Sequence, residues 1–191
     1  PQVVVQIPLT LTGHRVCFEG ILRYARIKWP RRRYLLEGRH GDQRLLDMKR
    51  WGCSGIITAA CSLSQAQAIA DTRVPVVVFE PDPDMRKSKH PLAKYSCLRV
   101  DSKATGEHAA RFFLERHFKH FAYVGTVHDR YWSRERGEGF KQTVEAANGT
   151  VSEYEAPKAK ERRDWAVEQP RMEAWLKALP KPVALFAAMD G

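Results

Sequence analysis

The segment Phe121–Phe140 reads FAYVGTVHDRYWSRERGEGF, and it decides the fold class. Its first four residues, Phe121–Val124, form a short apolar run of the kind found in strands that are covered on both faces. A helix is expected to follow, from Ser133 towards Ala147. In an open parallel sheet, ligands bind outside the carboxyl ends of the strands, where loops turn into helices. The segment therefore predicts an α/β fold with a ligand-facing edge near Tyr131–Phe140.

The same alternation extends over the whole chain. Strands are expected at Val3–Ile7, Arg33–Glu37, Ser54–Thr58, Pro75–Phe79, Ser96–Val100, Phe121–Val124, Thr150–Tyr154 and Val183–Ala187. Helices are expected between most of them, including a short one around Leu45–Met48 and one that begins at an Asp101 cap, while Pro81–Pro91 is expected to be a loop. Alternating strands and helices predict parallel sheets with right-handed crossovers.

A break near His117 divides the pattern into two lobes, residues 1–116 and residues 117–191. The second lobe is expected to be incomplete, since the last strand leads into Asp190-Gly191 with no helix to cover it. We therefore expect this sequence to be the two-lobed part of a longer protein.

Composition bounds the class of protein. Among 191 residues, 43% are hydrophobic and 28% are charged, which is ordinary for a soluble globular protein. No apolar run approaches the roughly 18 residues of a membrane span, and the first residues lack the order of a signal peptide, so a cytoplasmic protein without membrane contact is expected. The net charge of +10 favours polyanions, but without a helix-turn-helix pattern it indicates proximity to nucleic acid rather than recognition.

The common signatures of enzymes and cofactor sites do not occur. The sequence has no phosphate-binding P-loop, no G-x-S-x-G and no H-E-x-x-H motif. Gly137-Glu138-Gly139 lies inside the expected helix rather than in a strand-to-helix turn, so it is not a dinucleotide fingerprint. None of the four cysteines forms C-x-x-C, and reduced thiols are expected. We expect a protein that is not an enzyme and has no cofactor or metal, because a hydrolase or transferase would need a nucleophile and base that do not come together.

Polar and aromatic side chains instead gather after the strands. The candidate ligand-binding residues are His14, Arg15, Trp132, Arg136, Trp165 and Asp190. A guanidinium and a carboxylate can each hold vicinal hydroxyls with paired hydrogen bonds, and an indole face packs on the C–H face of a pyranose. The pattern predicts a sugar pocket in a cleft between the lobes.

Each candidate residue could instead have an ordinary structural role. Arg136 could form a salt bridge, the two tryptophans could pack at helix starts, and Asp190 could be an N-cap. His14 and Arg15 could be surface residues of a first helical turn. Arg134 points to the other side of the expected helix from Arg136, and a structural role is expected for it.

These residues resemble the sensor domain of lactose- and galactose-repressor-type regulators. The resemblance rests on Arg134-x-Arg136-x-x-Gly139-Phe140, on Asp164-Trp165 and on the closing strand into Asp190, with support from the stretches His14–Gly20, Trp51–Ile57, Tyr131–Arg136 and Trp175–Pro180. It implies a two-lobed fold of the periplasmic-binding-protein-like type I. Within the family the chain is similar to the xylose-operon activators, in which such a sensor precedes an arabinose-regulator-type DNA-binding domain.

The resemblance also implies roles for single residues. It places Arg136 on the family's sugar-binding arginine, Trp165 on a stacking tryptophan and Asp190 on a hydroxyl acceptor, with His14 and Arg15 on first-turn ligand positions. The loop Pro8–Gly13 lacks the polar residues of the xylose activators, and Met189 stands where related repressors often carry asparagine, so the sugar stays open.

Together these features predict the ligand-sensing domain of a bacterial transcription regulator. A monosaccharide, xylose or another, would control a homodimer that binds DNA through a domain outside this chain. The alternative is a solute-binding protein of a sugar transporter.

Overall fold

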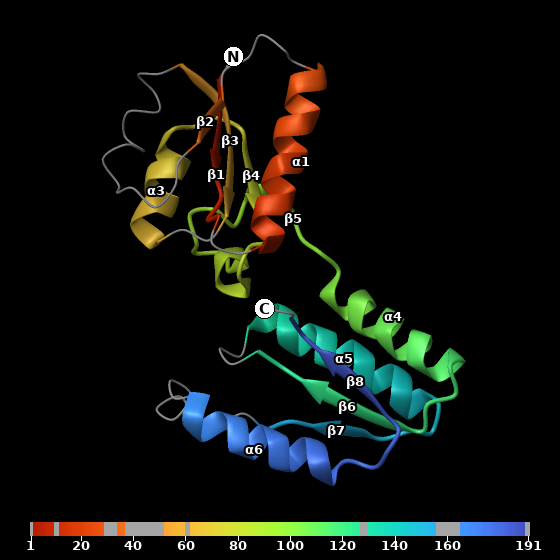
Figure 1. The fold of residues 1–191 in the computed structure, drawn as a ribbon. Coiled ribbons are helices and arrows are strands. Elements are labelled where there is room, and N and C mark those ends of the chain that lie inside the picture. The colour runs from red at the N-terminus through yellow and green to blue at the C-terminus, as the bar shows by residue number, and fades with distance from the viewer. Residues whose placement is uncertain are drawn as a thin grey trace. The chain divides into compact units, whose positions relative to one another are not determined.

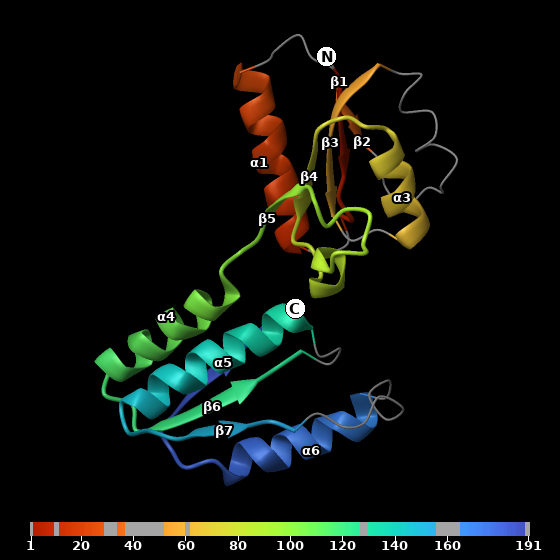
Figure 2. The ribbon, with the colours of Figure 1, turned by 180° about the vertical axis from the view of Figure 1, so that it is seen from behind.

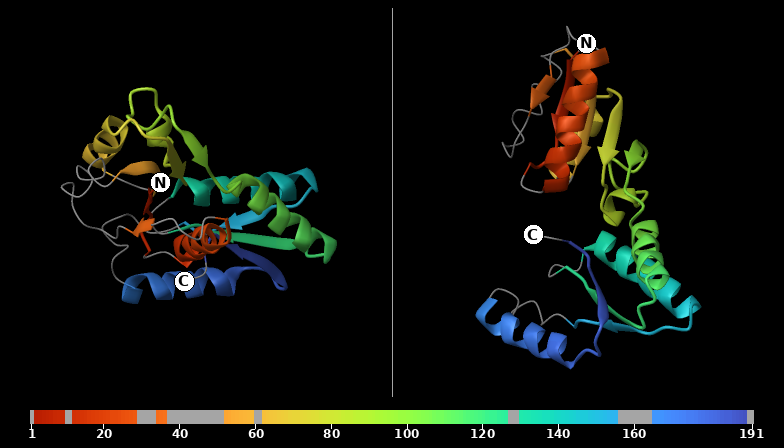
Figure 3. Two further views of the ribbon diagram at one scale, coloured as in Figure 1. Left: turned by 90° about the horizontal axis from the view of Figure 1, so that it is seen from above. Right: turned by 45° about the vertical axis from the view of Figure 1, so that its right-hand side comes forward.

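The computed structural model describes residues 2–9, 12–28, 34–36, 52–59, 62–126, 130–155 and 165–189. It divides the chain into two compact units, Pro1–Val100 and Asp101–Gly191. Figures 1 and 2 show the elements of each unit from opposite sides, and Figure 3 gives two further views. No helix among the described residues combines the length and the apolar character needed to cross a membrane.

The first unit contains a parallel sheet in the order β2-β1-β3-β4-β5. Its strands are β1 (Gln2–Gln6), β2 (Tyr34–Leu36), β3 (Cys53–Ala59), β4 (Val76–Phe79) and β5 (Ser96–Leu98), and its helices are α1 (Thr12–Lys28), α3 (Leu63–Asp71) and the short 3-10 helix η2 (Pro83–Arg86). One core cluster joins Ile69 of α3 to Val4, and another joins Phe18 of α1 to Val5. The two helices therefore cover opposite faces of the sheet, which explains why its strands are apolar on both sides.

The second unit contains a parallel sheet in the order β7-β6-β8. Its elements are α4 (Ser102–Glu115), β6 (His120–Val124), α5 (Tyr131–Ala146), β7 (Val151–Glu153), α6 (Trp165–Ala178) and β8 (Val183–Ala187). Phe121 and Tyr123 of the sheet pack with Phe140 and Val144 of α5 in one cluster. Figures 1 and 2 show α6 on the other side of this sheet from α5. The expected cap of α4 is confirmed, since an Asp101 carboxylate oxygen accepts the Ala104 N–H at 2.9 Å.

Helices α4 and α5 approach each other through glycines. A Cβ atom on Gly106 would overlap the backbone oxygen of Arg136, and one on Gly139 would overlap that of Lys103. Gly137 faces the other way, where a Cβ atom would lie 2.6 Å from the ring of Tyr123. The alternating glycines of the G-E-G segment therefore let α5 lie closely on α4 with one side and on the sheet with another.

The observed elements confirm the predicted alternation of strands and helices, with differences at the ends of elements. The strand predicted at Ser96–Val100 is observed at Ser96–Leu98, the helix predicted from Ser133 begins at Tyr131, and the predicted loop after Pro81 contains η2. Of the strand predicted at Arg33–Glu37, the structure describes Tyr34–Leu36. The expected helix around Leu45–Met48 lies outside the described residues.

The boundary between the two compact units also differs from the predicted lobes. The units divide after Val100 rather than after residue 116. The reason is that α4 packs on α5 and shares its core cluster through Ala110, so the helix belongs with the elements that follow it.

Gly139→Ala is expected to destabilise the chain by about 1–3 kcal/mol, because the added methyl group meets backbone that cannot rotate away. Gly20→Ala is the matched control, since this position in α1 has open space around a Cβ atom and alanine favours a helix by up to about 1 kcal/mol. Urea denaturation followed by circular dichroism measures both. Equal stability of the two variants would contradict the close α4–α5 packing.

Candidate functional site

The carboxyl edge of the second sheet brings two strand exits together. Strands β6 and β8 are parallel neighbours, so their ends meet at the same edge. The Ala188 N–H donates to the Val124 carbonyl at 2.8 Å and extends the pairing beyond the strands. Helix α5 begins at the same edge, at Tyr131. This edge is where the sequence predicted ligand contacts.

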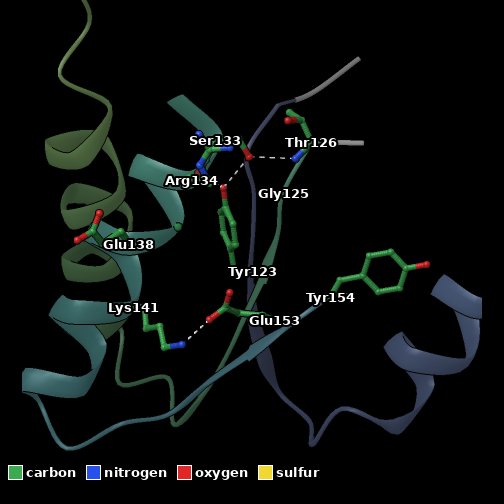
Figure 4. Close-up of a pocket in the computed structure, with 10 residues that line it drawn as sticks. Tyr123, Gly125, Thr126, Ser133, Arg134, Glu138, Lys141, Glu153 and Tyr154 are labelled. Atoms are coloured by element: carbon green, nitrogen blue, oxygen red, sulfur yellow. Dashed lines mark hydrogen bonds and ion pairs between the residues drawn. The ribbon is translucent and has the colours of Figure 1, made fainter. Parts of the chain in front are cut away.

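A network around Ser133 fixes the start of α5. The Tyr123 hydroxyl donates to the Ser133 carbonyl at 2.6 Å and lies 3.2 Å from the Ser133 hydroxyl oxygen, which also accepts the Thr126 N–H at 3.0 Å (Figure 4). Arg130, at the N-cap position, supplies no side-chain cap. Sequence reasoning missed this network, because the only signal for it was a serine in the first turn of the helix.

Arg136 reaches from α5 to the exit of β8. Its Nη1 donates to the Ala188 carbonyl at 2.6 Å, and its guanidinium carbon lies 4.8 Å from the centre of the Trp132 ring. Its Nε is buried and has no hydrogen-bond partner among the described residues. Trp132 is itself partly buried against the core cluster of this unit. The guanidinium is therefore held in one plane while an N–H group is left for another acceptor.

Arg134 lies on another side of α5 and lines a pocket of about 430 Å³. The lining residues are Tyr123, Gly125, Thr126, Ser133, Arg134, Gly137, Glu138, Lys141, Glu153 and Tyr154. Lys141 Nζ lies 2.6 Å from a Glu153 carboxylate oxygen (Figure 4). Glu138 points away from this pair in the same view, so the charged groups of the pocket do not all converge on one point. The two arginines thus serve different surfaces, as their spacing predicted.

Two tyrosines of this unit have altered acidity. Burial raises the pKa of Tyr123, and its hydrogen bond to Ser133 and the nearby Arg136 charge only partly oppose the rise. Burial also raises the pKa of Tyr154, as does the carboxylate of Glu168. The Tyr154 hydroxyl is buried without a hydrogen-bond partner among the described residues. Both phenols are therefore in their neutral form near neutral pH.

The other predicted site residues fall in different places. His14 Nδ1 lies 3.0 Å from the Pro8 carbonyl oxygen, and Arg15 Nη1 donates to the Leu9 carbonyl at 3.0 Å, so both close the turn that follows β1. Trp165 begins α6, but its side chain lies outside the described residues, as does Asp190. Of the six predicted residues, the structure brings Trp132 and Arg136 into contact.

No group of three or more His, Cys, Asp or Glu side chains that could hold a metal ion occurs in the part of the chain that the structure describes.

Comparison with known proteins identifies the fold. The profile of the Periplasmic binding protein-like domain matches residues 110–191. The chain is 28% identical over 96 residues to the xylose operon regulatory protein of Haemophilus influenzae; this match covers 49% of the chain and 24% of the relative. The chain therefore matches about a quarter of that protein's length.

Solved structures show the same fold over nearly the whole chain. The xylose-binding transcription activator XylR aligns with a TM-score of 0.73 at 21% identity, over 97% of this chain and 46% of its own. A LacI transcriptional regulator from Lactobacillus brevis aligns with a TM-score of 0.68 at 15% identity, over 97% and 68%. An ABC transporter solute-binding protein from Burkholderia multivorans aligns with a TM-score of 0.61 at 18% identity, over 80% and 59%. The chain has the α/β fold of periplasmic-binding-protein-like type I, with parallel sheets flanked by helices.

Tyr123→Phe is expected to reduce the decrease in the free energy of unfolding as pH rises above neutral. The pKa of Tyr123 is raised in the folded chain. The contribution of its neutral side chain to the free energy of unfolding is therefore fully present below pH about 10, the ordinary pKa of tyrosine, and is lost as pH rises through the pKa of the folded chain. The variant lacks this loss, although without the bond to Ser133 it should be about 0.5–1.5 kcal/mol less stable at pH 8.

Urea denaturation between pH 8 and pH 11 measures the difference. Tyr95→Phe serves as the control, since that hydroxyl reaches only the Ala70 carbonyl at 3.5 Å and the variant keeps Tyr123. Parallel pH profiles for Tyr123→Phe and the parent chain would contradict the burial of this phenol.

Proposed function

We propose that the chain is the ligand-sensing part of a bacterial transcription regulator and that it binds a monosaccharide between its two lobes. The observation that carries this proposal is the arrangement of Arg136. Its guanidinium is oriented by Trp132 and by the Ala188 carbonyl, and its buried Nε lacks a partner among the described residues. A buried donor without a partner is costly, so a ligand that supplies the acceptor is favoured.

A sugar hydroxyl suits this donor. Each hydroxyl accepts and donates hydrogen bonds, and a planar guanidinium can hold two neighbouring oxygens at once. Trp132 lies against the guanidinium rather than open to a ring face, so its proposed role is to hold Arg136 in the plane that receives the sugar. Trp165 and Asp190 stay proposed contacts on the strength of the resemblance alone.

His14 and Arg15 are the proposed contacts from the first lobe. Both side chains form hydrogen bonds with backbone carbonyl groups just after β1, at Pro8 and Leu9, and so lie at the carboxyl edge of the first sheet. A sugar that contacts residues of both lobes would favour one arrangement of the lobes over others, which is the physical requirement for a sensor.

The proposed response is a change in a homodimer that binds DNA in the cytoplasm through a domain outside this chain. The names of similar proteins support a regulator, since they include a xylose operon regulatory protein and a xylose-binding activator. Xylose is one candidate effector among monosaccharides. The second candidate function is a solute-binding protein of a sugar transporter, which is supported by the similar fold of such proteins.

Arg136→Ala is expected to weaken sugar binding about 10- to 100-fold, which corresponds to the loss of one or two hydrogen bonds from a charged donor. The ligand is first identified by a thermal-shift screen of pentoses and hexoses that includes D-xylose, and its affinity for parent and variant is then measured by calorimetry. Circular dichroism checks that the variant is folded.

Arg134→Ala is the matched control, because it removes the same group from the other side of α5. Sugar affinity should be unchanged in this variant. If Arg134→Ala abolished binding and Arg136→Ala retained it, the ligand would lie in the pocket of Figure 4 and the proposed site would be wrong.

A further inference from the structure

The net positive charge of the chain lies almost entirely in its first unit. Residues 1–100 contain 17 Lys and Arg and 8 Asp and Glu, whereas residues 101–191 contain 15 and 14. The first unit therefore carries nine of the ten net positive charges. An excess this large on about 100 residues favours a polyanionic partner for that unit.

The topology places described basic residues at one edge of the first sheet. Because the strands are parallel, each crossover must return the chain to the edge where strands begin. Helix α1 ends there with Arg26 and Lys28 in its last turn. Arg73 comes three residues before β4, and Lys94 comes two residues before β5. We call the surface formed by Arg26, Lys28, Arg73 and Lys94 the basic edge; the letter N in Figure 1 marks the end of the chain from which β1 begins at this edge.

All four side chains of the basic edge are exposed. Arg73 and Lys94 line one open depression of about 560 Å³ together with Gln67 and Asp71. Asp71 is the acidic side chain there, and its carboxylate accepts a hydrogen bond from Gln67 at 2.9 Å. The depression thus presents two cations and one occupied carboxylate to solvent.

Arg73 occupies a backbone conformation that seldom suits an arginine. Its φ is +59°, at the turn that ends α3, where glycine or asparagine is the usual residue. The turn therefore carries a positive charge where glycine would be less strained.

The opposite edge of the same sheet carries both signs of charge. Glu80, Asp82 and Asp84 follow β4, and so do Arg86 and Lys87, while Arg99 follows β5. Asp84 is paired with Lys87 at 2.6 Å. The sequence adds Arg31-Arg32-Arg33 before β2 and Lys49-Arg50 before β3, but these lie outside the described residues, and we base the proposal on the four side chains of the basic edge.

We infer that the basic edge of the first unit binds the phosphate backbone of duplex DNA. Cations on a broad edge contact phosphates without reading bases, and affinity comes from the release of counterions. The inference rests on the proposed function only for the choice of DNA as the polyanion. The sensing part itself would then add to the DNA affinity of the regulator.

The test measures binding of the 191-residue chain to a fluorescent 20-base-pair duplex of arbitrary sequence, by anisotropy, from 25 to 200 mM salt. The edge variant replaces Arg26, Lys28, Arg73 and Lys94 by Gln. Each phosphate contact contributes about 0.9 to the slope of log affinity against log salt, so the variant should lose up to about 3.6 of that slope and more than tenfold in affinity at low salt.

The control variant replaces Lys103, Lys119, Arg171 and Lys177 of the second unit by Gln, which removes the same charge from exposed positions. It should retain most of the parent's affinity and slope.

Equal losses in the two variants, or no binding of the parent chain at 25 mM salt, would overturn the inference. Tighter binding to phosphatidylserine vesicles than to the duplex would overturn DNA as the partner. Sugar affinity, measured separately, should be unchanged in both variants, so failure of this inference leaves the proposed function standing.

Discussion

The close approach of α4 and α5 fixes the geometry on which the second unit depends. Gly106 and Gly139 leave no room for a side chain between the two helices, so the backbone of each rests on the other. With α5 held in this way, its opposite side meets the sheet, and Phe140 and Val144 close the core. Arg136, whose backbone oxygen forms part of the glycine contact, is then directed to the exit of β8. The guanidinium proposed to hold the ligand is thus positioned by backbone packing rather than by a flexible loop.

The Arg136 contact also links parts of the chain that are far apart in sequence. Its bond to the Ala188 carbonyl spans 52 residues and joins the first turns of α5 to the end of β8. The Ser133 network does the same for the end of β6 through Thr126 and Tyr123. Both strand exits are therefore tied to one helix start, and a shift of α5 would move the candidate site as a unit.

The sequence predicted the elements well because their signals are local. Apolar runs such as Phe121–Val124 mark strands, and the Asp101 cap marks a helix start, within a few residues. The compact units divide after Val100, whereas the sequence predicted lobes that divide near His117, because α4 packs against α5 through glycines that carry no periodicity. Similarly, the arginine spacing predicted that Arg134 and Arg136 serve different surfaces, whereas the Ala188 acceptor and the Ser133 network required the folded chain.

The length of the strands limits how the two edges of the first sheet influence each other. The four residues of β4 span about 13 Å, and Arg73 and Glu80 lie beyond its two ends. The Debye length at physiological ionic strength is about 8 Å. A phosphate at one edge therefore changes the electrostatic potential at the other edge very little. Communication between the two edges would therefore pass through movement of the strands.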